Sequence, residues 1–140
     1  MSEFTLHPQL DADSHFVCDL PLSMVLLIND RQYPWYVLVP RVSDIKEAHQ
    51  LNTTDRQQLI IESDALCIAM ESLFTPDKMN VAAIGNMVPQ LHIHHIARYR
   101  HDAAWPAPVW GALPAIPYQA DDSQRMITRL SAQVIGLNHS

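Results

Sequence analysis

Polar side chains stand at alternate positions in one segment of this chain: Gln90, His92 and His94. Successive side chains of a strand point to opposite faces of its sheet, so these three are expected on one face, with Leu91 and Ile93 on the other. Each step of two residues covers about 6.6 Å, and the row is therefore about as long as a di- or triphosphate. Such a row can donate several hydrogen bonds to anionic oxygens without a lysine.

Imidazole also brings nucleophilic chemistry to this row, because its ordinary pKa of about 6.5 leaves it largely neutral at physiological pH. One ring nitrogen of His92 can attack phosphorus while a backbone carbonyl holds the proton on the other nitrogen, which gives a covalent intermediate. A protonated His94 can then stabilise charge on the phosphate oxygens. The same spacing also fits a metal site completed by a remote carboxylate, or hydrogen-bonded structural histidines. The residues alone leave these alternatives open.

Other residues near the row have both a functional and a plain structural interpretation. Asn86 can donate to a phosphate from the preceding turn, or can simply form that turn. Arg98 can meet distal phosphates, or can be an exposed surface residue. His95 lies on the opposite face and is expected to be a hydrogen-bonded structural histidine. Trp105 and Trp110 can cover a base or close a dimer contact, although packing of their proline-rich segment is the simpler interpretation.

The elements that must position these residues follow from hydrophobic patterns and turn residues. Short apolar, β-branched runs predict strands, and apolar residues at helical intervals predict two helices, the first beginning at Thr54 with capping-box spacing to Gln57. The order predicts an α+β fold with an antiparallel sheet of about five strands and two helices. The predicted strands are 15–19, 23–29, 35–40, 79–84 and 90–98, and the predicted helices are 54–75 and 121–137.

Length, charge and cysteine content exclude several classes of protein. The 140 residues are expected to form a single domain, with its core at about 15–110. A net charge of −6 with only 9 Lys and Arg argues against nucleic-acid binding. No apolar run reaches the ~20 residues of a membrane span, and a signal-peptide pattern is missing. Two widely spaced cysteines fit a reducing compartment, so a cytoplasmic protein without cofactor or metal is expected.

The segment around the histidines resembles the signature of the histidine triad family, His-φ-His-φ-His-φ-φ, where φ is apolar. His92 falls on the middle histidine, which in that family is the nucleophile that becomes nucleotidylated. His94 falls on the third, which contacts the phosphate. Val88 and Arg98, on either side of the motif, are typical of family sequences. Residues 34–41 resemble the family's Pro-Gly-His-x-Leu-φ-φ-Pro segment.

Three departures from the family pattern stand out. The first triad position is Gln90, which can hydrogen-bond but cannot carry a proton at neutral pH, so an orienting role survives there and a proton shuttle does not. Trp35-Tyr36 replaces the Gly-His of the upstream segment. The family's ribose-contacting residue would align near Ile28, which makes the neighbouring Asn29 and Asp30 the candidates for contacting a ribose.

The resemblance spans roughly residues 23–110 and implies a hydrolase or nucleotidyl transferase. Its substrates would carry phosphoanhydride or phosphoramidate bonds, with dinucleoside polyphosphates such as diadenosine tetraphosphate as the first suggestion. His92 would attack the α-phosphate, while His94 and backbone amides stabilise charge. The alternatives are a nucleotide-binding protein of the same fold without catalysis and, from a different class, a histidine-based metal site. The resemblance also implies a two-fold homodimer.

Overall fold

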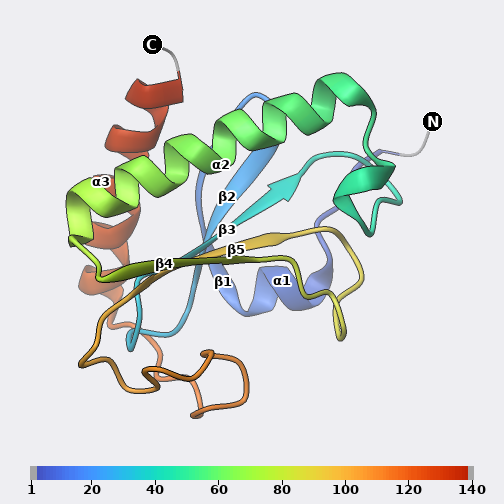
Figure 1. The fold of residues 1–140 in the computed structure, drawn as a ribbon. Coiled ribbons are helices and arrows are strands. Elements are labelled where there is room, and N and C mark those ends of the chain that lie inside the picture. The colour runs from blue at the N-terminus through green and yellow to red at the C-terminus, as the bar shows by residue number, and fades with distance from the viewer. Residues whose placement is uncertain (1–2, 139–140) are drawn as a thin grey trace.

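The computed structural model describes residues 3–138, which form a five-stranded sheet with three α-helices and one short 3-10 helix (Figure 1). In chain order the elements are α1 (Pro8–Ala12), β1 (Ser14–Asp19), β2 (Ser23–Ile28), β3 (Trp35–Pro40), the 3-10 helix (Ala48–Gln50), α2 (Thr53–Phe74), β4 (Lys78–Ala82), β5 (Ile93–Arg98) and α3 (Ala120–Asn138).

The strands lie in the order β1-β2-β3-β5-β4, and every neighbouring pair is antiparallel. The predicted α+β class with an antiparallel sheet is therefore confirmed. Helix α1 was not predicted, although Pro8 at its first position is a known start signal. Strand β5 begins at Ile93, three residues later than predicted.

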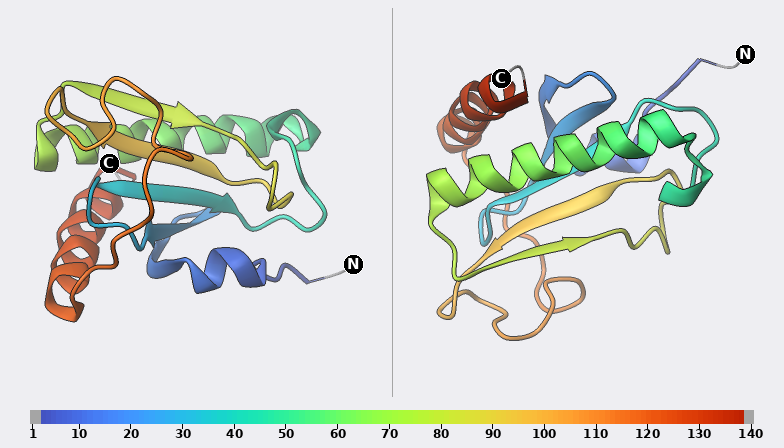
Figure 2. Two further views of the ribbon diagram at one scale, coloured as in Figure 1. Left: turned by 90° about the horizontal axis from the view of Figure 1, so that it is seen from below. Right: turned by 45° about the horizontal axis from the view of Figure 1, so that its top comes forward.

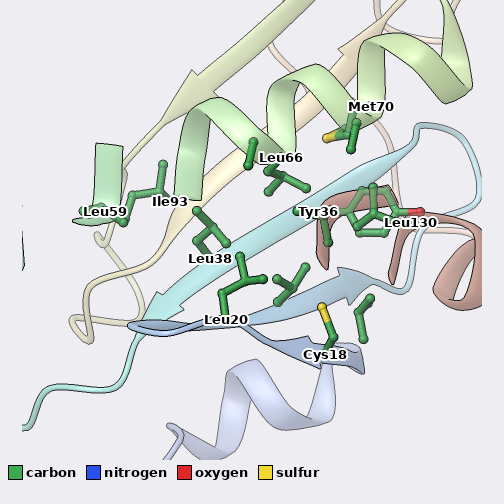
Figure 3. Packing of buried hydrophobic residues seen from close by; sticks show 14 of the residues in the cluster. Cys18, Leu20, Tyr36, Leu38, Leu59, Leu66, Met70, Ile93 and Leu130 are labelled. Atoms are coloured by element: carbon green, nitrogen blue, oxygen red, sulfur yellow. The ribbon is translucent and has the colours of Figure 1, made fainter. Parts of the chain in front are cut away.

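The two faces of the sheet carry separate hydrophobic clusters. On one face α2 and α3 pack through Leu66, Met70 and Leu130, all fully buried (Figure 3). On the other face lie α1 and the loop between β5 and α3, which pack through Leu10 and Val109. Figure 2 shows α1 on the side of the sheet opposite α2. Because β5 runs through the middle of this arrangement, side chains on both of its faces are buried.

The ends of α2 follow from local backbone chemistry. The Asn52 side chain caps the helix by accepting from the Asp55 backbone N–H at 2.8 Å, so the predicted capping box beginning at Thr54 is wrong. Thr75 adopts a left-handed conformation with φ 47° and ends the helix, and Pro76 follows, as expected. Within residues 3–138, none of the helices has the length and apolar character that crossing a membrane requires.

Candidate active site

His92 and His94 lie side by side, with ring centroids 4.9 Å apart, and both line a cavity of about 380 Å³. His92 immediately precedes β5, and the alternation of faces continues through it, with His92 and His94 at the cavity and Leu91 and Ile93 in the core. Leu91, Ile93 and His95 point the other way, into the core beneath α2 or toward α2 itself. The predicted pairing of the two histidines on one face is thus observed.

The cavity wall is mainly apolar and comes from segments far apart in the sequence. A second cavity of about 580 Å³ shares five lining residues with it, so the two form one continuous groove. Lysine and arginine do not occur among the described residues that line the first cavity, which leaves neutral donors to hold an anion there. The lining residues are Leu10, Asp13, Ile28, Trp35, Ile84, Gly85, Asn86, Met87, Val88, His92, His94 and Trp110.

The ring of His92 is oriented by its own backbone. Its Nδ1 lies 2.6 Å from the carbonyl oxygen of Gln90. A carbonyl only accepts, so Nδ1 carries the hydrogen and donates it, and in the neutral ring Nε2 keeps its lone pair. This is the arrangement that a nucleophilic imidazole needs.

His94 takes the opposite tautomer. The indole Nε1–H of Trp35 donates to Nδ1 of His94 at 2.9 Å, so in the neutral ring the hydrogen sits on Nε2. Burial, with smaller contributions from neighbouring His92 and His95, lowers the pKa of His94 to about 3. The expectation of a protonated His94 is therefore wrong, because a second hydrogen on Nδ1 would face the indole N–H. His94 is a neutral hydrogen-bond donor.

His95 is fully buried and has a structural role, as expected. Its Nδ1–H donates to the carbonyl oxygen of Ile93 at 3.0 Å, and its Nε2 accepts from the Ser63 hydroxyl of α2 at 2.7 Å. Burial lowers its pKa to about 4, an effect that the hydrogen bond to Ile93 partly offsets. The neutral ring joins β5 to α2.

Gln90 does not line the cavity that contains the two histidines. Its side-chain oxygen accepts from the backbone N–H of His7 at 2.8 Å, and its side-chain nitrogen donates to the carbonyl of Thr5 at 2.9 Å. Both ends of the amide are thereby engaged with the N-terminal segment. The expected continuous row of three side chains is wrong at this position, because the amide is turned toward residues 5–7.

Comparison with known families decides the identity of this arrangement. Residues 9–101 match the HIT domain family model, about two thirds of the chain and including both cavity histidines. The chain belongs to the histidine triad family. In this histidine triad protein the middle and third motif histidines are the pair in the cavity, and the first motif position is the glutamine outside it.

Solved structures agree with this assignment. The protein is similar to a histidine triad protein from Marinobacter aquaeolei VT8, with 48% identity, TM-score 0.94, and coverage of 97% of this chain and 99% of that one. It is similar to a Bradyrhizobium japonicum histidine triad protein, with 42% identity, TM-score 0.93 and coverage of 95% and 99%. A Sinorhizobium meliloti 1021 HIT protein has 36% identity, TM-score 0.91 and coverage of 93% and 96%. Among curated proteins, no match was found.

The residues predicted to bind substrate occupy different places in the groove. Asn86 lines the cavity of the two histidines. Asn29 and Asp30 line only the adjoining cavity, and both brace the loop that precedes α3. The Asn29 side-chain oxygen accepts from the Tyr118 N–H at 3.0 Å, and an Asp30 oxygen accepts from the Ile116 N–H at 3.4 Å. The Asn29 oxygen and one of the two Asp30 carboxylate oxygens are thus already engaged by backbone N–H groups.

Arg98 is neither a phosphate ligand nor a surface residue, so both interpretations of it are wrong. It is 1% exposed and donates to both carboxylate oxygens of Asp102, at 2.8 and 3.1 Å. Its Nη1 and Nη2 groups also donate to Asn80 Oδ1 and to the Ala107 carbonyl, both at 2.9 Å. The guanidinium holds the loop after β5, and Arg98 is not among the residues that line the cavity of the two histidines.

The structure also adds cavity residues that the sequence interpretation missed. The sequence interpretation uses Trp35 only as part of the Trp35-Tyr36 replacement of the family's Gly-His, and Ile28 only as an alignment position, yet both line the cavity. Leu10 and Asp13 reach it from α1 and the turn after it. The ring of Trp110 packs edge-on against the ring of His94, with 5.1 Å between the ring centroids. Its position therefore fits one of the two functional interpretations of Trp110, that it covers a bound ligand.

A metal site has little support in this geometry. Across residues 3–138 there is no cluster of three His, Cys, Asp or Glu side chains suited to holding a metal ion. The Nδ1 atoms of His92 and His94 are both engaged in hydrogen bonds. Metal coordination would need a third protein ligand beside the two Nε2 atoms, and the described residues supply none.

Proposed function

We propose that this protein cleaves nucleotidyl bonds through a covalent nucleotidyl-histidine intermediate on His92. The observation that carries the proposal is the pair of complementary imidazoles on one cavity wall. His92 has a free Nε2 lone pair, and His94 has an Nε2–H beside it, with the rings 4.9 Å apart. Membership of the histidine triad family supports a nucleotide-binding or hydrolase type of protein.

The chemistry follows from these two rings. The Nε2 lone pair of His92 forms a bond to the α-phosphorus, and the bond from phosphorus to the leaving group breaks. The electron pair departs with that group, which takes a proton from solvent where it leaves as an amine. His94 donates its Nε2–H to a phosphoryl oxygen as charge develops there. Water then attacks the same phosphorus, the N–P bond breaks, and the water proton passes to solvent. The products are a nucleoside monophosphate and the leaving group.

The rest of the groove suits the organic part of a nucleotide. Trp110 and Met87 line both cavities, and Met87 is almost fully exposed, which makes its flexible side chain available to a base. The amide of Asn86 and the backbone of its turn offer neutral donors to phosphate. Substrates with phosphoanhydride or phosphoramidate bonds, such as diadenosine tetraphosphate or adenosine 5′-phosphoramidate, are therefore the first to test.

The decisive experiment removes the nucleophile. His92→Asn should lower turnover of either substrate by at least about 10³-fold, because the neighbouring imidazole of His94 presents an N–H and not a lone pair to phosphorus. Turnover is measured by chromatography of the released mononucleotide. Rapid quenching followed by mass spectrometry of peptides should locate a nucleotidyl adduct on His92 of the unmodified protein.

His49→Asn serves as the matched control, since His49 is an exposed histidine in the 3-10 helix, away from the cavity. It should retain full turnover, and both variants should unfold at a temperature close to that of the unmodified protein. Undiminished turnover in His92→Asn would contradict the mechanism.

Nucleotide binding without catalysis is a second candidate, favoured by one observation. The amide of Gln90 is fully engaged with residues 5–7, so the first triad position contributes nothing to proton transfer in the cavity. Calorimetric binding of the same nucleotides, with neither product nor adduct, would establish this alternative.

We also propose a two-fold homodimer formed along β4. This strand is an outer strand of the sheet, and its edge carries unpaired backbone groups. Val81 on β4 and Ile84 after it are exposed, as are Ile60, Ile61 and Ile68 on α2. The opposite outer strand, β1, is interrupted by a bulge between Phe16 and Cys18, which makes its edge irregular. Pairing of two β4 strands would continue the sheet.

A further inference from the structure

Trp35 is the side chain that determines which end of His94 faces the groove. Its indole nitrogen can only donate a hydrogen bond, and it donates to Nδ1 of His94 at 2.9 Å. Both side chains are buried, Trp35 at 8% exposed and His94 at 6%, so water does not readily replace this bond. The hydrogen of the neutral His94 ring is therefore placed on Nε2.

The position of Trp35 is itself held by strand register and packing. Trp35 pairs with Ile96 across β3 and β5, while Val37 pairs with His94, so the indole lies diagonally beside His94 on the same face. Tyr33 and Trp110 contact the indole edge-on, with centroid distances of 6.3 and 6.0 Å. The donor is thus in place before any ligand arrives.

An indole at position 35 restricts the tautomer of His94, which an imidazole at the same position would not do. A histidine can either donate or accept, so a histidine in place of Trp35 would allow His94 to hold its hydrogen on either nitrogen. Indole allows only one arrangement. Beside it, the backbone carbonyl of Gln90 imposes the opposite tautomer on His92. The two rings consequently present a lone pair and an N–H to the same cavity.

We propose that Trp35 is a positioning residue that holds His94 as the neutral Nε2–H tautomer and so directs one hydrogen bond to the phosphoryl group that His92 attacks. The assignment of the tautomer stands on the ligand-free protein alone. The consequence for catalysis rests on the proposed function. A purely space-filling role would predict instead that changes at Trp35 alter stability while leaving the His94 tautomer unchanged.

The test replaces the donor and keeps the ring. Trp35 is replaced by 3-benzothienylalanine, which has the shape of tryptophan with sulfur in place of the N–H, and in a second variant Trp35→Phe is made. Long-range ¹H–¹⁵N spectra of the ligand-free, ¹⁵N-histidine-labelled protein report which nitrogen of His94 is protonated. We expect pure Nε2–H in the unmodified protein and a substantial Nδ1–H population in both variants.

Trp110→Phe is the matched control, because Trp110 contacts the His94 ring at 5.1 Å without a hydrogen bond to it. His94 of this variant should remain in the Nε2–H form.

In turnover assays, kcat of the 3-benzothienylalanine variant should fall about tenfold, with little change in KM. This loss is smaller than the 10²–10³-fold that removal of a complete oxyanion donor costs, because part of the His94 population keeps its Nε2–H. Retention of pure Nε2–H in both Trp35 variants would overturn the proposal. Absence of turnover in the unmodified protein would count against the proposed function and leave the tautomer result standing.

Discussion

Arg98 and Asp102 form a buried ion pair that fastens the loop after β5 to the sheet. Their side chains are only 2% and 3% exposed. Asp102 also accepts from the backbone N–H groups of Tyr99 and Trp105, while Arg98 reaches Asn80 on β4. Each charge is thus satisfied by several partners. Removal of one member leaves the other charged, buried and incompletely paired.

Asp102→Asn should therefore destabilise the protein by about 3–5 kcal/mol, the usual consequence of breaking a buried pair from one side. Urea unfolding measures the difference. Asp19→Asn is the matched control, because Asp19 pairs with Arg41 at 3.0 Å but its side chain is 60% exposed. That substitution should change the free energy of unfolding by less than about 1 kcal/mol. Equal effects of the two substitutions would refute the assignment.

The same carboxylate gives stability a dependence on pH. Burial alone would raise the pKa of Asp102, but the hydrogen bonds from Arg98 and from the amides of Tyr99 and Trp105 outweigh it and lower the pKa from 3.8 to about 2. A folded-state pKa below the unfolded one stabilises the protein above about pH 4, and this stabilisation is lost as the pH falls toward 2. Asp102→Asn should make the unfolding free energy less dependent on pH over this interval.

The individual residues of the site show which of their roles the sequence could predict and which it could not. Alternation along one extended segment correctly separated His92 and His94 from His95, because it depends only on local backbone geometry. The roles of Arg98 and Trp35 escaped prediction. Each depends on a partner brought close by strand pairing or by a folded loop, and spacing along the chain does not contain that information.

At the scale of elements, Gln90 connects the extended segment before β5 to the N-terminal segment that leads into α1. The side-by-side oxygen and nitrogen of its amide match the N–H of His7 and the C=O of Thr5, as a backbone peptide group would. The two nitrogens of an imidazole point in more divergent directions, so a histidine at this position could not hydrogen-bond to both of these backbone groups in this way. Glutamine at the first triad position therefore suits a structural contact that positions one wall of the cavity.

Gln90→Ala should loosen this N-terminal segment without unfolding the sheet. The backbone amide of His7 loses its acceptor, and its hydrogen exchange should become about tenfold faster, in keeping with the loss of a hydrogen bond in a locally opening segment. Because Leu10 and Asp13 line the cavity, KM for nucleotides should rise more than kcat falls. Exchange measured by NMR, together with steady-state kinetics, tests both effects.

Two variants control for a general effect of altering a glutamine. Gln90→Glu keeps the oxygen that accepts from His7, so protection of that amide should survive while the donor to Thr5 is lost. Gln57→Ala, at an exposed position of α2, should leave exchange at His7 unchanged. A large fall in kcat for Gln90→Ala with constant KM would instead indicate a direct part in catalysis.

The longer elements were predictable because each has a strong local signal. Strands β2 and β3 are apolar runs separated by turn residues, and α2 ends immediately before Thr75 and Pro76, where a helix stop was expected. Helix α1 has only five residues, too few for a periodic pattern, and the late start of β5 depends on where its pairing with β3 and β4 begins, at Ile93 and His94. Short elements at the site were thus the least predictable.

At the scale of the whole molecule, the sequence order predicted the α+β class but not the groove. Antiparallel pairing and the two helices follow from the order of the elements. The cavity wall combines Leu10, Ile28, Met87 and Trp110 with the histidines, and these residues meet only because α1 and the loop after β5 cover the same face of the sheet.

The proposed dimer makes a prediction at this same scale. A protein paired along β4 should sediment at twice its 15.9 kDa chain mass. Val81→Lys places a charge on the edge strand, where burial against a second copy is unfavourable, and should shift the protein toward 15.9 kDa at micromolar concentration. Phe16→Lys, at an exposed aromatic position on the opposite outer strand, should leave the dimer intact.

Sedimentation velocity separates these outcomes at equal protein concentration. Dissociation by Phe16→Lys alone would place the interface on β1, and a monomeric unmodified protein would remove the dimer altogether. Met87 lines the groove and lies in the turn after β4. A dimer interface along β4 would therefore lie close to the nucleotide groove. With the interface this close to the groove, the nucleotide affinity of Val81→Lys should depend on protein concentration, because this variant exchanges between monomer and dimer in the measured range. The affinity of the unmodified protein, which stays dimeric, should not.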